Sequence, residues 1–471
     1  NSKVISALQG LMCDKDFCTL YSLFMLALAR KELSTCSFRL FIGEKPILLQ
    51  TIEDLPTKAT DEELKEAFVD EWGVKYSKDG RKLLKAPKKL DGIYSIRKGT
   101  KIICEEAFRW SKTIGCLFLK SLVIPDSVTN IGDYAFWGCK SLKSLVISDS
   151  VTSIGDYAFD GCCSLRCVVI SDGVTRIGNY AFWGCKSLKS LVIPDSVTHI
   201  GNGAFNACSS LKSLVIPASV GNIIGNPFSG WNGELKCLSP YFIYDNKVLF
   251  DKDKSKIIAF RDRNTTSYVI PDSVSCIEFG AFWNCHSLKR LVLPDSVSSI
   301  GDWAFWNCRS LTDIVIPDSV NSIGDRVFFG CCSLKSLVLP DSVSSIGESA
   351  FEDCTSLSSL VIPEGVTSIG HCAFRGCYSL SNIVIPNGVT SIGGCAFDGC
   401  KSLNSVVIPD SVTSIGYWAF QFCSSLNDII IPDSVNSIGD GAFWGCSFPY
   451  DLKKELISRF GDKIFGNHDG L

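Results

Sequence analysis

The chain has few of the residues on which catalysis and metal binding usually depend. Its 471 residues include only four histidines, scattered along the sequence, and no CxxC pair of the kind found in zinc sites. It also lacks a P-loop, a nucleophile elbow and a dinucleotide-binding fingerprint. We therefore expect no catalytic residue, no cofactor and no metal. The histidines are His199, His286, His371 and His468.

The chain also lacks a strong net charge and a long apolar run. A formal net charge of -3 gives no overall field that would attract nucleic acid or an anionic membrane. A bilayer-spanning helix needs about 18 or more apolar residues. The nearest run, residues 17–29, is shorter and includes Cys18 and Thr19. We expect a buried core helix there, no transmembrane segment and no nucleic-acid partner.

The dominant feature of the sequence is a 23-residue repeat, for example SLKSLVISDSVTSIGDYAFDGCC from Ser141. Such a unit cannot bury its apolar face alone, so successive copies must stack into a solenoid with a continuous core. In each copy one apolar residue stands directly before a short turn that usually reads Pro-Asp or Ser-Asp, and we call this residue the anchor of the repeat. It stands at Ile124, Ile147, Ile170, Ile193 and Ile216, then at Ile270, Leu293, Ile316, Leu339, Ile362, Ile385, Ile408 and Ile431.

Each copy reads as a short strand, a turn and a large inward side chain. In one copy, Leu145 and Ile147 alternate around Val146 as a strand requires, and Ser148 to Ser150 supply turn chemistry. Stacked copies place strands in parallel about 4.8 Å apart, in roughly fifteen rungs. A phenylalanine recurs twelve residues after each anchor, and we predict that this row forms the core. It runs Phe108, Phe136, Phe159, Phe182, Phe205, Phe228, Phe282, Phe305, Phe328, Phe351, Phe374, Phe397, Phe420 and Phe443.

Half of the 24 cysteines occupy one repeat position. Rungs about 4.8 Å apart hold their Cβ atoms outside the roughly 3.5–4.5 Å range of a disulfide, so we predict buried free thiols. A row of aspartates follows the anchors without the paired ligands of a calcium motif, which favours turn capping. The cysteines are Cys139, Cys162, Cys185, Cys208, Cys285, Cys308, Cys331, Cys354, Cys377, Cys400, Cys423 and Cys446.

The LxxLxIPxxVxxIGxxAFxxCxxL positions, from about Lys75 to Cys446, resemble the leucine-rich repeats of the BspA-like bacterial surface-antigen class. This resemblance implies a right-handed leucine-rich-repeat coil with stacked parallel short strands, mostly β with loops. It also implies a non-enzymatic protein that binds partner macromolecules, as adhesins and secreted antigens do.

The array has a break and two irregular ends. Val74–Ala86 and Val248–Phe260 both read as β-hairpins, and they align at a constant offset of 174 residues. We expect an extra turn at Phe242–Lys247, before the second hairpin. The predicted organisation is a helical N-terminal cap or remnant of an upstream region (1–70), a first repeat block opening with a hairpin (71–230), an irregular hairpin insert (231–268), a second repeat block (269–446) and a helical C-terminal cap (447–471).

Three surfaces are candidates for binding. The outward residue of each strand is a valine, represented by Val292 and Val315, and this stripe is either a contact surface or cross-strand packing. Beside it lies a basic row, either a steering surface or a solvated face. Aromatic residues after the core phenylalanines, Trp137, Trp183 and Trp306, are either binding anchors or stacked neighbours. The basic row is Lys120, Lys143, Arg166, Lys189 and Lys212.

Three functions remain open at this point. The first is a secreted or cell-surface, adhesin-like or antigen-like protein that binds a protein ligand such as a host extracellular-matrix or surface protein. The second is an intracellular, cytoplasmic scaffold or sensor, which unpaired cysteines would suit. The third is a recruiting module of a larger enzyme truncated at Asn1. The sequence identifies neither the ligand nor the binding face.

Overall fold

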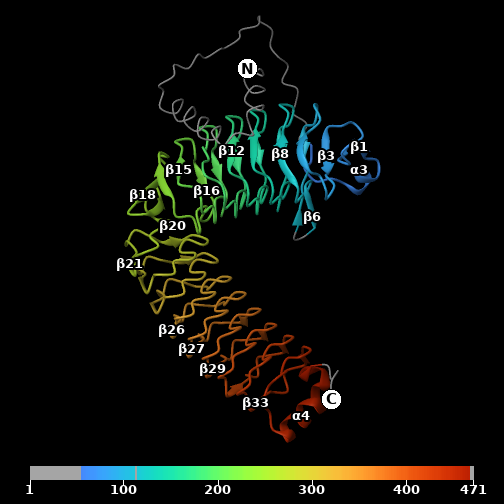
Figure 1. Cartoon of the computed structure of the whole chain (residues 1–471). Helices are drawn as coiled ribbons and strands as arrows, with labels where there is room; N and C mark the ends of the chain where they lie inside the picture. Colours follow the sequence, from blue (N-terminus) through green and yellow to red (C-terminus); the bar gives the residue numbers. More distant parts are fainter. Residues whose placement is uncertain (1–54, 112–113, 467–471) are drawn as a thin grey trace, which may run out of the picture.

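The computed structural model describes residues 55–111 and 114–466 of the chain. It is a β-solenoid of about 15 turns with stacked parallel strands and little helix, which confirms the predicted fold class. Figure 1 shows a curved rod with two arms, which meet at strands β18 to β20. The helix expected at residues 17–29 lies outside the described residues. Within the described part of the chain, no helix is long and apolar enough to cross a membrane.

The first ladder of strands comes from the LxxLxI part of each repeat. Its strands pair in parallel with a shift of one repeat, so that Leu145 lies beside Leu122 and Val168. The strands are β4 (Gly92–Ser95), β8 (Leu119–Val123), β10 (Ser144–Ile147), β12 (Cys167–Ile170), β15 (Ser213–Ile216), β17 (Glu234–Cys237), β21 (Ser267–Val269), β23 (Arg290–Val292), β25 (Asp313–Ile314), β26 (Ser336–Val338), β27 (Ser359–Val361), β29 (Asn382–Val384), β31 (Ser405–Val407) and β33 (Asp428–Ile430).

The second ladder comes from the two residues before the repeat glycine. Isolated bridges at Ile323, Ile346 and Ile369 continue it between β24 and β28. A small antiparallel pair, β6 (Arg109–Ser111) and β7 (Ile114–Gly115), stands apart from it. The ladder strands are β5 (Ile102–Ile103), β9 (Asn130–Ile131), β11 (Ser153–Ile154), β13 (Arg176–Ile177), β14 (His199–Ile200), β16 (Asn222–Ile223), β22 (Cys276–Ile277), β24 (Ser299–Ile300), β28 (Ser368–Ile369), β30 (Ser391–Ile392), β32 (Ser414–Ile415) and β34 (Ser437–Ile438).

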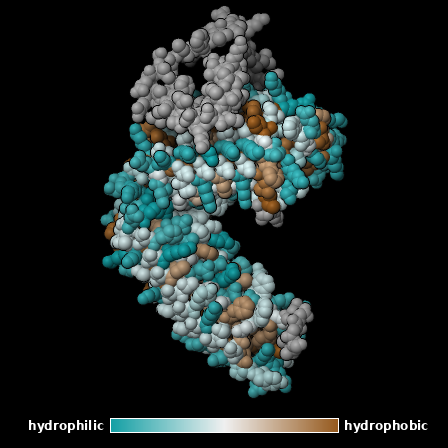
Figure 2. Space-filling view, in the orientation of Figure 1, coloured by the Kyte–Doolittle hydropathy of each residue, from teal (hydrophilic) through white to brown (hydrophobic). Residues whose placement is uncertain are grey.

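The phenylalanine row runs through the core, as predicted. Every member is fully buried, and neighbouring rings such as Phe351 and Phe374 stack with centroids 5.4 Å apart. At the joint between the arms, Phe260 continues the row and lies 4.9 Å from Phe282. Each arm therefore has a core built on a row of stacked phenylalanine rings surrounded by aliphatic residues. The visible surface is largely hydrophilic with smaller apolar patches (Figure 2).

The repeat-position cysteines are free, as predicted. Each thiol points into the core and donates to the carbonyl of the phenylalanine one coil earlier, as Cys162 Sγ does to Phe136 O at 3.3 Å. Burial raises the pKa of most of these thiols, that of Cys208 to about 12. At Cys285 the effect of burial is outweighed by a hydrogen bond from Cys308 and by the charge of Arg263, which lower its pKa. The thiols with a raised pKa remain protonated and act as small apolar groups with one hydrogen bond.

Both predicted hairpins form, and each carries one strand more than expected. β2 (Lys75–Tyr76) and β3 (Lys82–Lys85) pair antiparallel, and β1 (Phe68–Val69) adds to β2. In the second unit β18 (Phe242–Asp245) pairs with β19 (Val248–Asp251), which pairs with β20 (Lys256–Phe260). Phe242–Asp245 is thus a strand, and the extra turn expected at Phe242–Lys247 is confined to Asn246 and Lys247, which connect β18 to β19. β18 starts 174 residues after β1, so the relation between the two units extends to this strand.

The second hairpin belongs to both arms. Successive side chains of a strand point to opposite faces, and β19 and β20 use this alternation to pack against two separate cores. The two arms are therefore joined through a shared two-faced element. Leu249, Ile258 and Ala259 pack in the core of the first arm, and Val248, Phe250, Ile257 and Phe260 pack in the core of the second.

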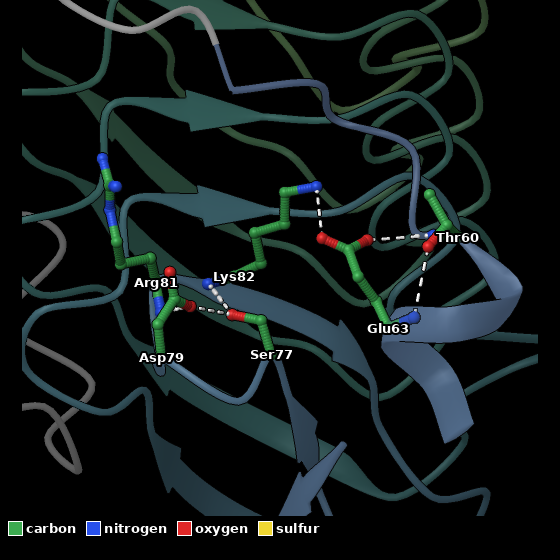
Figure 3. A network of polar contacts seen from close by, with 6 residues as sticks. All are labelled: Thr60, Glu63, Ser77, Asp79, Arg81 and Lys82. Carbon is green, nitrogen blue, oxygen red and sulfur yellow. Dashed lines mark hydrogen bonds and ion pairs between the residues drawn. The ribbon is translucent and has the colours of Figure 1, made fainter. Parts of the chain in front are cut away.

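The N-terminal end is closed by a short helix and a buried ion pair. Helix α3 (Asp61–Lys65) starts with a capping box in which Thr60 and Glu63 exchange backbone and side-chain hydrogen bonds. Figure 3 shows Lys82, from β3, reaching toward Glu63. The two charges are 2.8 Å apart, and the side chain of Lys82 is only 6% exposed. This pair fixes α3 against the first hairpin.

The C-terminal end is closed by helix α4 (Tyr450–Phe460) and the 3-10 helix η1 (Asp462–Phe465). Leu456 and Ile464 are buried in the core of the second arm. Phe443 N donates to Ile464 O at 2.8 Å, so η1 takes the place of a further coil. Figure 1 shows α3 and α4 at opposite ends of the rod.

Candidate interaction surfaces

The valine stripe is solvent-exposed along the second arm. In β26, β27 and β29, Val338, Val361 and Val384 lie side by side in register and are 75%, 66% and 73% exposed. Their strand neighbours, such as Leu360, are buried. Val292 and Val315 belong to the same stripe, at 36% and 71%. Adjacent valines therefore form a continuous apolar strip that the solenoid itself leaves uncovered.

The five basic residues lie in one row on consecutive coils. Lys143 N donates to Lys120 O at 2.9 Å, and the same bond continues from Arg166 to Lys143 and from Lys189 to Arg166. All five side chains are exposed. Each basic residue stands three residues before the outward valine of its own coil. The basic row therefore runs beside the part of the valine stripe that lies on the first arm. Lys120 has a long contact of 3.7 Å to exposed Asp91, which contributes little stability.

The first group of aromatic candidates is half-buried in a stack on the first arm. Tyr134, Tyr157 and Tyr180 stack with centroids 4.7 and 4.8 Å apart. Trp137 donates its indole N–H to Asp160 at 2.7 Å, and Trp183 packs 5.2 Å from Tyr180. Burial raises the pKa of Asp160 to about 6, although the bond from Trp137 opposes this shift.

The second group lies on the other arm and is separate from the first. Trp306 contacts Trp283 at 4.7 Å and Trp303 at 5.8 Å, and Arg326 stacks over Trp303. The structure therefore divides the three predicted tryptophans between two clusters, and each cluster packs on its own neighbours. Both clusters follow the second ladder, whereas the valine stripe and the basic row belong to the first ladder.

A shallow groove of about 500 Å³ lies near the C-terminal end of the second arm. Tyr378 and Phe422 give it apolar walls. Arg375 contributes a charge and is held between Glu352 at 3.1 Å and Asp398 at 3.3 Å. Sequence reasoning missed this groove because its residues occupy variable repeat positions. The available signal was their 23-residue spacing, which stacks them in consecutive coils.

The structure also brings together His371, Cys372 and Cys395. Their side-chain nitrogen and sulfur atoms all lie within 4.8 Å of one another. Burial raises the pKa of Cys372 to about 12. The sequence analysis treated His371 as one of four scattered histidines and considered only the core cysteine row. The missed signal was a second pair of cysteines 23 residues apart, outside that row and next to a histidine.

The comparisons with known proteins agree with this geometry. The family model described as BspA type leucine rich repeat region matches the chain in six copies, over residues 101–233, 256–377 and 344–471. The comparison with curated proteins found no match to this chain.

Among solved structures, a leucine-rich repeat protein from Eubacterium ventriosum is 26% identical, covering 70% of this chain and 85% of its own, with a TM-score of 0.52. A leucine-rich cell surface protein from Faecalibacterium prausnitzii is 29% identical, covering 77% and 94%, with a TM-score of 0.43. The pneumococcal vaccine antigen PcpA is 18% identical, covering 84% and 96%, with a TM-score of 0.44. Since the family model covers well over half of the sequence, the chain belongs to the BspA-type leucine-rich-repeat family.

Proposed function

We propose that this chain is a non-enzymatic protein-binding solenoid that contacts a partner protein through its valine stripe. The observation that carries the proposal is the exposure of Val315, Val338, Val361 and Val384, each of which has a buried residue before and after it in the chain. A folded chain gains nothing from leaving such a strip in water, whereas a partner that covers it gains hydrophobic free energy.

The basic row supports a partner with an acidic rim. Lys143, Arg166 and Lys189 are solvated and lie beside the first-arm members of the stripe, Val146, Val169 and Val192. Such charges accelerate encounter with an oppositely charged protein more than they strengthen the final complex. The partner we propose therefore has an apolar centre and an acidic edge.

The stripe is tested with Val292→Asp and Val315→Asp together, using an array of purified host extracellular-matrix and cell-surface proteins and surface plasmon resonance. We expect faster dissociation of any protein that the wild-type chain binds, because each aspartate places a charge in the contact. Ser298→Asp with Asn321→Asp is the matched control, since it adds the same charges to exposed positions of the same two coils on the second ladder. Equal dissociation rates for the two double variants would refute the strand face as the site.

The basic row is tested separately with Lys143, Arg166 and Lys189 replaced by glutamate. Association should slow and lose its salt dependence, with folding intact because the three side chains are exposed. A contact through the aromatic clusters predicts the opposite effect of the variants on binding. If Trp137, Trp183 and Trp306 to alanine abolished binding while the strand-face variants bound normally, the contact would lie on the second ladder.

We further propose that the chain is secreted or displayed at the cell surface, as the surface antigens of its family are. A specific observation favours the alternative of a cytoplasmic scaffold. The described cysteines form no disulfide bonds, which suits a reducing compartment. Antibody labelling of intact against permeabilised cells separates the two. Labelling only after permeabilisation would support the scaffold.

A further inference from the structure

The cluster of His371, Cys372 and Cys395 lies where the residue types at two adjacent repeat positions of the second arm change. In earlier coils the position of His371 holds an acidic residue whose carboxylate accepts the backbone N–H one coil later. Asp302 accepts from Asp325 N at 2.9 Å, and Asp325 accepts from Glu348 N at 2.7 Å. At His371 an imidazole replaces this carboxylate.

The next residue in each coil changes at the same place. This position holds Trp303 and Arg326 in earlier coils, and it becomes Cys372 and then Cys395. The backbone ladder continues through the change, with Cys372 N donating to Gly394 O at 2.9 Å and Cys395 N donating to Tyr417 O at 2.8 Å. The two thiols are therefore held in adjacent coils by the same bonds that hold the rest of the rod.

Gly394 leaves the imidazole nitrogen uncovered. It occupies the position of His371 one coil later, and a Cβ there would lie 3.0 Å from His371 Nδ1 and 2.9 Å from Tyr417 Cε1. With glycine, the rings of His371 and Tyr417 approach to 5.6 Å across the gap. No side chain of residue 394 therefore lies against the nitrogen, and the ring of Tyr417 stands across the gap.

We propose that His371, Cys372 and Cys395 form a binding site for Zn²⁺. Binding of the ion displaces the proton of each thiol into solvent. Two thiolates and one imidazole are ligands that Zn²⁺ prefers, and three protein ligands leave a fourth position for water. In a tetrahedral site the ligand atoms stand roughly 3.3–3.8 Å apart. The present atoms, within 4.8 Å of one another, need to close by about 1 Å. Cys372 and Cys395 are buried, and His371 is partly exposed, so the ion reaches the site from solvent on the side of His371.

The test uses the full chain, purified under reducing conditions, stripped with a chelator and reloaded with Zn²⁺ or Co²⁺. We expect one equivalent of zinc to survive gel filtration, and cobalt to give the charge-transfer and visible bands of a tetrahedral thiolate site. Cys372→Ser and Cys395→Ser should each lose more than about tenfold in affinity. Cys332→Ser, which removes a partly exposed cysteine outside the cluster, should bind as the wild-type chain does.

A second variant tests the geometry without touching a ligand. Gly394→Ala adds one methyl group against His371 Nδ1, and its backbone angles suit alanine. Zinc binding should weaken in this variant, while melting of the metal-free chain changes little. The proposal is overturned if the wild-type chain retains no zinc, if Cys372→Ser binds it equally well, or if mass spectrometry finds a Cys372–Cys395 disulfide in protein purified without reductant.

Discussion

The stability of each coil depends on a single benzyl side chain. Phe305 is fully buried and lies between Phe282 and Phe328 at centroid distances of 5.5 and 5.3 Å. Its removal leaves a cavity that the rigid coils on either side cannot fill, because both are fixed by backbone hydrogen bonds.

Phe305→Ala should therefore lower the free energy of unfolding by about 3–5 kcal/mol, measured by urea denaturation. Since repeats couple to their nearest neighbours, faster hydrogen exchange should centre on the adjacent coils. Phe329→Ala is the control, because that ring follows the spine residue of the next coil and is only partly buried. An unchanged denaturation midpoint in Phe305→Ala would contradict the position of this ring in the core.

Residue-scale predictions succeeded where the repeat fixes one side chain in every coil. The phenylalanine spine and the free thiols follow from position alone, because stacking makes every coil's environment the same. The cluster at His371 could not be read in that way. It depends on residues that depart from the repeat, and their proximity appears only when variable positions are compared across coils.

Among the elements, the N-terminal helix depends on a buried charge pair. Burial by itself would raise the pKa of Glu63, but its bonds to Lys82 and to the Thr60 amide outweigh this effect and lower the pKa below the ordinary 4.5. A carboxyl group whose pKa is lowered on folding stabilises the fold above its unfolded pKa. That stabilisation is lost as the pH falls through the folded value.

We expect α3 and the first hairpin to loosen at acidic pH below about 4.5, detected as faster local hydrogen exchange after correction for its intrinsic pH dependence. Glu63→Gln should loosen them already at neutral pH, because Lys82 is left buried without its partner. Glu66→Gln is the matched control, since its contact with Lys78 is exposed on both sides. The same exchange rates in both variants would show that the buried pair does not hold the helix.

The elements with strong periodicity could be predicted from the sequence, whereas two strands, β1 and β18, were missed. Helix α3 lies within residues 1–70, where a helical N-terminal cap was expected, and both hairpins were recognised from their sequence pattern. β1 and β18 escaped because their pairing depends on contacts with β2 and β19 and not on their own pattern. β1, with two residues, carries too little periodicity to be seen, and β18, with four, was expected to be part of a turn.

At the scale of the whole molecule, the second hairpin determines how a loss of packing at the joint is divided between the two arms. Leu249 packs in the core of the first arm and its neighbour Phe250 in the core of the second. The two residues are adjacent in one strand, so they offer a matched pair of perturbations.

Leu249→Ala should speed hydrogen exchange chiefly in the first arm and Phe250→Ala chiefly in the second, with each loss strongest next to the joint. Each truncation should cost about 2–5 kcal/mol of stability. If both variants loosened the same arm, the division of the core at this hairpin would be wrong.

The uniformity of the coils has a genetic consequence. Equivalent hydrogen bonds join residues 23 positions apart in both arms, for example between Thr152 and Thr129 and between Thr413 and Thr390. A gene that encodes repeated units of one length is prone to unequal recombination, and gain or loss of one whole unit keeps the 23-residue register of these hydrogen bonds. The arms can therefore lengthen or shorten between generations in steps of one coil. Each step adds or removes one exposed valine, so the reach of this protein can evolve without any change in its fold.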